Sequence, residues 1–324
     1  MKAYLGIDGG GSKTLFALAD EEGRLLSVWR AGSASYKQIG TEELLELVKT
    51  GRKQVLLLAK EKLEEEIFLE SCCLGMPMYG ESEEMDRKIE EQFKQHFPQD
   101  KLLLVNDAVA GWAGALLLQP GINVVAGTGS IAYGRNEQGQ EGRSGGWSEW
   151  FSDEGSGRWL GMRCLQLFSK EADGRLEKGA LYDLVKKQLK LKQDEEIIDL
   201  FEREYLPRRD RLASLQRILL EAARAGDREA KGAYEEAAGE LAELARAVKQ
   251  KLFVKEGCPV TCSGGIFQVG DLVMKPFQRK LEEAGMEFVK RQAEPHLGAI
   301  LLAYTYSRKE KPPQSFAENL RKPV

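Results

Sequence analysis

The sequence predicts an α/β protein built from two halves of related architecture. Short apolar segments of strand length alternate with longer segments of helical periodicity, which is typical of this class. The 34 glycines gather in discrete clusters rather than in the periodic or low-complexity runs of collagen and linkers. A unit of strand, glycine loop, strand, turn and strand occurs twice, and a shift of 116 residues sets Gly11 on Gly127. These observations indicate two related halves, each opening with a glycine-loop hairpin.

Length and composition exclude several classes of function. A chain of 324 residues with 42% hydrophobic residues is long enough for about two domains. The near balance of 47 basic and 51 acidic residues excludes a strong basic excess of the kind that binds nucleic acid electrostatically. No apolar run approaches the ~18 residues that span a bilayer, so we expect no membrane partner. Five cysteines without framework spacing favour reduced thiols and a cytoplasmic location.

The first half begins with the glycine-loop hairpin and continues as alternating strands and helices. We expect strands at 3–7, 15–19, 24–29, 70–76 and 102–105. We expect helices at 42–66, 83–96 and 108–118.

The second half repeats the hairpin and then becomes mostly helical. We expect strands at 121–126 and 131–133, a third strand after the turn at 136–139, and further strands at 259–262 and 287–289. Helices are expected at 155–168, 269–284 and 296–307, and through most of 176–252 with breaks at Pro207 and Gly226. The region 176–252 either covers a sheet, which we favour, or forms a homodimer surface. The proline-containing tail 308–324 is expected to be loosely held.

The two glycine loops have the chemistry of phosphate-binding turns. They join strands of a hairpin, unlike a Walker-A or dinucleotide-binding loop, which leads from a strand into a helix. Backbone N–H groups can bind anions in such loops, and hydroxyls and a lysine can add further contacts. Asp8 at the strand end is placed to hold Mg²⁺ through water. The predicted cofactor-binding residues are Asp8, Gly9, Gly10, Gly11, Ser12, Lys13 and Thr14 in the first loop, and Gly127, Thr128, Gly129 and Ser130 in the second. The alternative, two ordinary tight hairpins, is disfavoured by the repeated arrangement.

Asp107 follows a predicted strand and precedes a helix. One interpretation makes it the N-cap of that helix, a role that aspartate fills well. The other makes it a carboxylate at the carboxyl end of a strand, where a kinase needs a group to take the proton of an acceptor hydroxyl. Both roles can hold together.

The segment 144–161 combines aromatic residues with carboxylates. Trp147, Trp150 and Trp159 occur near Glu149, Asp153 and Glu154. Aromatic faces beside carboxylates suit a polyhydroxylated sugar. The equally weighted alternative is a hydrophobic corner, with Asp153 capping the following helix. Further on, Gly264 and Gly265 lie between a predicted strand and helix, where they would allow close approach of an adenine-ribose.

Six motifs, taken in chain order, resemble the acetate and sugar kinase, heat-shock protein and actin superfamily. Within that superfamily they resemble the BadF/BadG/BcrA/BcrD ATPase family, and within that family its N-acetylglucosamine kinase branch. The motifs are GIDGGGSKT, NDA, VVAGTGSIAYGRNEQG, GGWSEWFSDEGSG, CSGGIF and HLGAI. The resemblance implies two ribonuclease-H-like, actin-like ATPase domains with a nucleotide and sugar cleft between them. The N-terminal domain would take residues 1–117 plus 296–324, including a glycine-containing closing helix. The C-terminal domain would take 118–295 with a helical insertion.

The resemblance also implies the chemistry. ATP with Mg²⁺ would phosphorylate a small-molecule sugar, an N-acetylated hexosamine, at its 6-hydroxyl, with Asp107 as the base. The implied substrate-binding residues are Ser35, Tyr36, Asn106, Gly146, Trp147, Asp153 and Glu154. Ser35 stands where the branch usually has asparagine, and 148–152 departs from its Gly-His pattern. Phosphoryl transfer is therefore better supported than the identity of the acceptor.

The sequence leaves two alternative functions. One is a family ATPase that activates a 2-hydroxyacyl-CoA dehydratase through an iron–sulfur cluster, which needs suitably placed cysteines. The five cysteines, Cys72, Cys73, Cys164, Cys258 and Cys262, lack that spacing, and buried thiols are favoured. The other is a binding protein that has lost catalysis, which the presence of Asp8, Asp107 and both loops disfavours.

Overall fold

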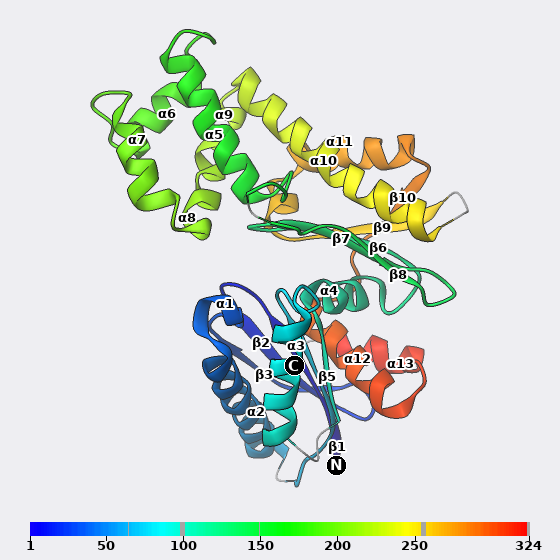
Figure 1. The fold of residues 1–324 in the computed structure, drawn as a ribbon. Helices are drawn as coiled ribbons and strands as arrows, with labels where there is room; N and C mark the ends of the chain where they lie inside the picture. The colour runs from blue at the N-terminus through cyan, green and yellow to red at the C-terminus, as the bar shows by residue number, and fades with distance from the viewer. Residues whose placement is uncertain (64, 98–100, 149, 254–256, 323–324) are drawn as a thin grey trace. The chain divides into compact units, whose positions relative to one another are not determined.

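The structure is a computed structural model that describes residues 1–63, 65–97, 101–148, 150–253 and 257–322 (Figure 1). The predicted α/β class is confirmed, because the chain forms two five-stranded mixed sheets with helices. It divides into two compact units, residues 1–120 with 290–324 and residues 121–289. The functional domain ranges given above stay a prediction.

The sheet of the first unit has the order β3-β2-β1-β4-β5. Its strands are β1 (Lys2–Gly9), β2 (Thr14–Asp20), β3 (Leu25–Ala31), β4 (Phe68–Met76) and β5 (Leu102–Asn106). β1, β2 and β3 form an antiparallel meander, whereas β4 lies parallel to β1 and β5 parallel to β4. The central strand β1 is buried from Ala3 to Ile7, as its unbroken apolar run predicts.

Within its described residues, this unit has six helices: α1 (Tyr36–Ile39), α2 (Thr41–Leu63), α3 (Glu83–His96), α4 (Asp107–Leu116), α12 (Pro295–Arg308) and α13 (Gln314–Leu320). The closing helix α12 packs on both α4 and β1. A Cβ at Gly298 would lie 2.2 Å from the Gly114 nitrogen, and one at Gly6 would lie 2.3 Å from the His296 oxygen. Glycine at these positions therefore lets α12 approach α4 and β1 closely.

The tail is packed, so the prediction that it is loosely held is wrong. α13 buries Phe316 and Leu320. The Phe316 ring lies 4.7 Å from that of Tyr304 and 5.9 Å from that of Tyr4, measured between centroids. Asn319 donates a 2.8 Å hydrogen bond to the Glu22 carbonyl. Apolar residues four apart in a short helix outweigh the neighbouring prolines and charges.

The sheet of the second unit has the order β10-β9-β6-β7-β8. Its strands are β6 (Gly121–Ala126), β7 (Ser130–Arg135), β8 (Glu141–Gly145), β9 (Cys258–Ser263) and β10 (Met286–Phe288). β6, β7 and β8 form an antiparallel meander, and β9 and β10 continue the sheet in parallel. This is the plan of the first sheet, so the predicted structural repeat is confirmed.

The helices of this unit are α5 (Gly157–Ala172), α6 (Ala180–Gln188), α7 (Glu196–Leu200), α8 (Arg209–Ser214), α9 (Gln216–Arg224), α10 (Arg228–Leu252) and α11 (Asp271–Glu283). A π-helical turn spans Phe201–Tyr205, and a 3-10 helix spans Gly265–Val269. α10 covers β6, β7 and β8 with a buried face rich in alanine, as favoured for part of the helical region. α6, α8 and α9 instead pack with α5 and with one another.

None of the helices in the described parts of the chain is both long and apolar enough to cross a membrane.

Candidate active site

Two carboxylates lie at one end of the first sheet. In the pairing of β1 with β4, Asp8 is opposite Gly75; in that of β4 with β5, Met76 is opposite Asn106. Asp8 and Asp107 therefore flank the carboxyl end of β4, the edge at which parallel strands present functional groups. Gly75 has no side chain, and a Cβ there would lie 3.5 Å from the Asp107 Cα and 2.8 Å from the Ala110 Cβ.

Asn106 caps α4. Its Oδ1 accepts a 3.0 Å hydrogen bond from the Ala108 N–H, and its Nδ2 donates to the Tyr79 carbonyl at 2.8 Å. Asp107 is the first residue of the helix, so the N-cap interpretation of Asp107 is wrong. Asn106 holds the helix start and the 79-80 turn together, and its predicted contact with substrate stays a prediction.

Burial controls the charge of the two carboxyls. It raises the pKa of Asp107 to about 7, and the neighbouring Asp8 adds to that rise. Burial also raises the pKa of Asp8 to about 6, although the Lys13 ammonium opposes this rise. A carboxyl with a pKa near neutrality is suited to accepting a proton at physiological pH.

The first glycine loop is an exposed hairpin tip. Gly9 pairs with Thr14 to end the ladder, and the Gly10 N–H donates to the Lys13 carbonyl at 2.9 Å. Gly11, Ser12 and Lys13 are exposed. The Thr14 hydroxyl is buried and donates to the Gly32 carbonyl at 2.7 Å, a different partner from the predicted phosphate.

The segment that holds Ser35 and Tyr36 lies beside this loop. The Ala34 N–H donates to the Gly10 carbonyl at 3.0 Å, and the Ser35 N–H donates to the Ser33 hydroxyl at 3.1 Å. Tyr36 is buried, and its hydroxyl has no hydrogen-bond partner among the described residues. Burial raises the pKa of Tyr36, and Glu81 and Asp86 add to the shift. The first unit thus contains Asp8, Asp107, the first glycine loop and the segment of Ser35 and Tyr36, whose predicted contact with substrate stays a prediction.

The second glycine loop is bonded to the segment that follows β8. The Ser130 N–H donates to Asp153 Oδ1 at 3.1 Å, and the Ser130 hydroxyl donates to the Glu154 carbonyl at 2.7 Å. The carbonyls of Gly127 and Thr128 accept hydrogen bonds from the N–H groups of residues 157 and 158 at 2.8 and 3.2 Å. Loop and helix start therefore form one rigid piece, with Thr128 and Gly129 at its tip.

Asp153 is buried against this loop, with a left-handed φ of 67°. Its Oδ2 accepts a 2.5 Å hydrogen bond from Nη2 of Arg209. Helix α5 is capped by Ser156, whose hydroxyl accepts from the Trp159 N–H at 3.2 Å, so the predicted cap by Asp153 is wrong. Arg209 was not predicted from the sequence, because no motif separates it from the neighbouring arginines.

The aromatic residues 147, 150 and 151 do not form a buried corner, whereas Trp159 is partly buried and packs against the core of this unit. Trp147 and Trp150 are 72% and 62% exposed, and Phe151 is exposed as well. The guanidinium of Arg143 lies over the Trp147 ring, and that of Arg158 over the Trp150 ring. Gly146 has a φ of 65°, which supports the turn into this loop. Glu149, named with the tryptophans above, lies outside the described residues.

Gly264 and Gly265 follow β9. Gly264 has a φ of 103°, and a Cβ there would lie 2.2 Å from the Ala126 oxygen, so only glycine fits against the end of β6. Gly265 begins the 3-10 helix. The turn thus lies beside the start of the second glycine loop, and its predicted adenosine contact stays a prediction.

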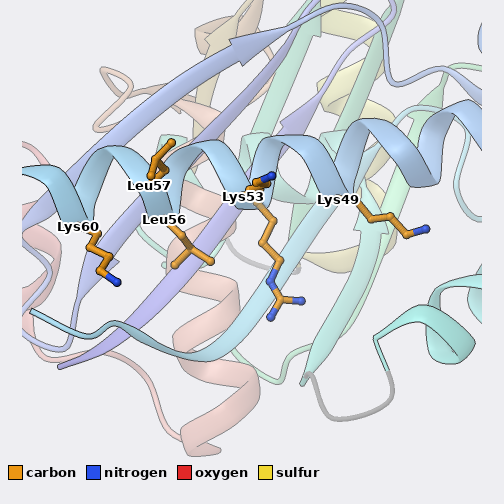
Figure 2. A pocket seen from close by; sticks show the side chains of 6 residues that line it. Lys49, Lys53, Leu56, Leu57 and Lys60 are labelled. Atoms are coloured by element: carbon orange, nitrogen blue, oxygen red, sulfur yellow. The ribbon is translucent and has the colours of Figure 1, made fainter.

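A basic hollow on α2 contains none of these predicted residues (Figure 2). It is lined by Lys49, Arg52, Lys53, Leu56, Leu57 and Lys60.

Comparison with known proteins yields a family model and several relatives. The model of the BadF/BadG/BcrA/BcrD ATPase family matches residues 5–303. An N-acetylmuramic acid/N-acetylglucosamine kinase of Clostridium acetobutylicum is 31% identical over 94% of this chain and 98% of its own length. An N-acetyl-D-glucosamine kinase of Dictyostelium discoideum is 28% identical over 93% of this chain and 97% of its own.

Solved structures show the same fold. A candidate N-acetylglucosamine kinase of Chromobacterium violaceum has a TM-score of 0.74 and 27% identity, covering 93% of this chain and 99% of its own. A ROK family glucokinase of Streptomyces griseus, solved with glucose and AMPPNP, has a TM-score of 0.53 and 16% identity, covering 94% and 99% of the two chains.

Proposed function

The chain belongs to the BadF/BadG/BcrA/BcrD ATPase family, and from this premise we propose that it is an ATP-dependent kinase that phosphorylates an amino sugar. The observation that carries the proposal is Asp107, a carboxyl at the carboxyl end of β5 whose pKa is raised to about 7. The kinase names of the two curated relatives, which match the chain almost end to end, support it.

In the proposed reaction Asp107 is the general base. The acceptor hydroxyl oxygen attacks the γ-phosphorus of ATP while its proton passes to the Asp107 carboxylate. A new P–O bond forms to the sugar as the bond from the γ-phosphorus to the bridging oxygen breaks, and ADP leaves with that electron pair. At pH 7 a substantial fraction of Asp107 is ionised and able to accept the proton.

Following the family motifs, we assign the phosphates of the nucleotide to residues of the glycine loops. Gly11, Ser12 and Lys13 are exposed at the tip of the first loop, and Thr128 and Gly129 form the tip of the second. We assign Gly264 and Gly265 to the adenosine, following the family motif. ATP is thus held largely by backbone groups, which agrees with the absence of a strong basic excess in the sequence.

Mg²⁺ fits this arrangement. Burial disfavours the charged forms of Asp8 and Asp107, and repulsion by Asp8 adds to the effect on Asp107. A divalent cation would offset these effects. The described residues contain no cluster of three or more metal-ligating side chains, which agrees with an ion that keeps waters and phosphate oxygens as ligands. Asp8 would hold the ion through water, and the ion would neutralise charge on the phosphates.

The proposed acceptor is N-acetylglucosamine or a related N-acetylated hexosamine, phosphorylated at O6. The match of Gly146, Trp147, Asp153 and Glu154 to the motif around the sugar supports this assignment. The exposed Trp147 face suits the C–H face of a pyranose. Ser35 in place of the usual asparagine and the altered segment 148–152 make the acceptor the feature to test first.

A coupled assay of ADP release tests the proposal directly. We expect turnover with N-acetylglucosamine or N-acetylmuramic acid well above that with glucose, and a product that NMR shows to be phosphorylated at O6. Asp107→Asn should lower kcat by about 10²–10⁴-fold while leaving ATP binding nearly intact. Asp173→Asn, which removes an exposed carboxylate paired with Arg175, is the matched control and should behave as wild type. ATP hydrolysis that no sugar stimulates would contradict the kinase assignment.

A further inference from the structure

One ion pair lies against the second glycine loop, and its arginine has no part in the proposed reaction. Nη2 of Arg209, at the start of α8, donates to Asp153 Oδ2 at 2.5 Å. A Cβ at Gly129 would lie 2.7 Å from that same Nη2 and 2.8 Å from both Asp153 oxygens. The absence of a side chain at Gly129 therefore lets the carboxylate and the guanidinium lie directly on the loop backbone.

The charges at this place pose an electrostatic problem for nucleotide binding. Asp153 is only 3% exposed, and it occupies the Ser130 N–H of a loop predicted to bind phosphate. A carboxylate at this position would repel a phosphate anion unless a cation compensated for it. Arg209 supplies that cation, because its guanidinium pairs with the buried oxygen while its side chain remains 45% exposed.

Backbone geometry on both sides of the pair is of the kind found at functional sites. Asp153 holds a left-handed φ of 67°, which is costly for a residue other than glycine. The π-helical turn Phe201–Tyr205 precedes α8, and such turns occur frequently at functional sites.

We propose that Arg209 is a phosphate-binding residue that neutralises Asp153 and donates a charge-assisted hydrogen bond to the terminal phosphate of ATP. This inference rests on the proposed kinase function. Because a guanidinium carries five N–H donors, Arg209 can keep its hydrogen bond to Asp153 and donate to the phosphate as well. During transfer it stabilises charge on the γ-phosphoryl oxygens, while the bonds that form and break are those given above.

The test compares three variants with wild type. Arg209→Ala removes the guanidinium, and Arg209→Lys keeps the charge but loses the fork geometry. Arg208→Ala is the matched control, because Arg208 is the adjacent residue and pairs with the exposed Asp210. The readouts are calorimetric affinities for ADP and for AMPPNP, a non-hydrolysable ATP analogue, together with kcat, KM and thermal melting.

We expect wild type and Arg208→Ala to prefer AMPPNP over ADP, and Arg209→Ala to lose about tenfold of that preference. kcat of Arg209→Ala should fall about 10²–10³-fold, with a much smaller change in the KM for sugar, and added guanidinium should restore part of it. Arg209→Lys should have a kcat and an AMPPNP preference between those of wild type and Arg209→Ala. A purely structural role would not produce rescue or a selective loss of the preference for the triphosphate.

An unchanged AMPPNP-to-ADP ratio with kcat within about threefold of wild type would overturn the proposal for Arg209. If Arg209→Ala melts below the assay temperature, Arg209→Lys decides by the same readouts. The two hypotheses fail separately. Wild type that phosphorylates no sugar, with the AMPPNP preference still lost in Arg209→Ala, refutes the kinase assignment alone. Wild-type kinase activity that Arg209→Ala retains refutes only the role of Arg209.

Discussion

At the scale of single residues, the fold holds Asp107 at a cost to stability. Burial and the nearby Asp8 raise its pKa from 3.8 to about 7, so its ionised form is less favourable in the folded protein than in the unfolded chain. Such a cost to stability is typical of groups that serve chemistry.

Asp107→Asn should therefore stabilise the protein at pH 8. The wild-type side chain is ionised in both states at that pH, so the neutral amide removes a penalty of about 1–3 kcal/mol, allowing for partial exposure. The gain should shrink as the pH falls from about 7 toward 3.8, because the folded wild type then takes up its proton first.

Urea denaturation at pH 8 and pH 5, without nucleotide or Mg²⁺, measures this difference. Asp173→Asn serves as control and should show no gain of this kind at either pH. An Asp107→Asn protein less stable than wild type at pH 8 would show that the Asp107 carboxylate is instead held by favourable interactions.

Residues differ in how far the sequence predicts them. Asp8, Asp107 and the two loops are marked by local patterns, since each lies at the end of an apolar segment of strand length. Arg209 contacts Asp153 across 56 residues of sequence, and it sits among other arginines with nothing to distinguish it. Thr14 and Asn106 belong to matching motifs, yet their polar groups bond to the protein backbone, which a motif does not reveal.

At the scale of elements, strands and hairpins were predicted well because their signals are short and local. The third strand of the second meander, β8, and the breaks near Pro207 and Gly226 are confirmed. The tail was predicted wrongly because a seven-residue helix has little stability alone, and α13 exists through packing on Tyr4 and Tyr304. Such long-range burial leaves only a faint pattern in the sequence.

Phe316→Ala should accordingly destabilise the first unit by about 3–5 kcal/mol, because it removes a fully buried aromatic ring that packs on Tyr4 and Tyr304. The free energy of unfolding from urea titration measures the loss. Ser315→Ala, at an exposed position of the same helix, should change it by no more than about 0.5 kcal/mol. A Phe316→Ala protein as stable as wild type would mean that α13 contributes nothing to the core.

At the scale of the whole molecule, the two sheets have equivalent strand orders. The repeat detected in the sequence covers the antiparallel meander of each sheet, because its strands and turns have short, local sequence patterns. Short connections and right-handed crossovers then leave few ways to add the parallel strands. The five cysteines lie in three different elements: Cys72 and Cys73 lie in β4, Cys164 in α5, and Cys258 and Cys262 in β9.

That distribution predicts a protein without an iron–sulfur cluster, in contrast to a dehydratase activator. Cluster ligands are thiolates, whereas burial raises the pKa of Cys164 and of Cys258 to about 12 and that of Cys73 well above its usual value. Protein purified anaerobically and incubated with iron and sulfide should show no cluster absorption in the visible range, and its sugar-dependent ADP release should be unchanged. Cys262→Ser, at the partly exposed thiol, should behave as wild type. Stoichiometric iron with a visible band that this substitution abolishes would instead assign the chain to electron transfer.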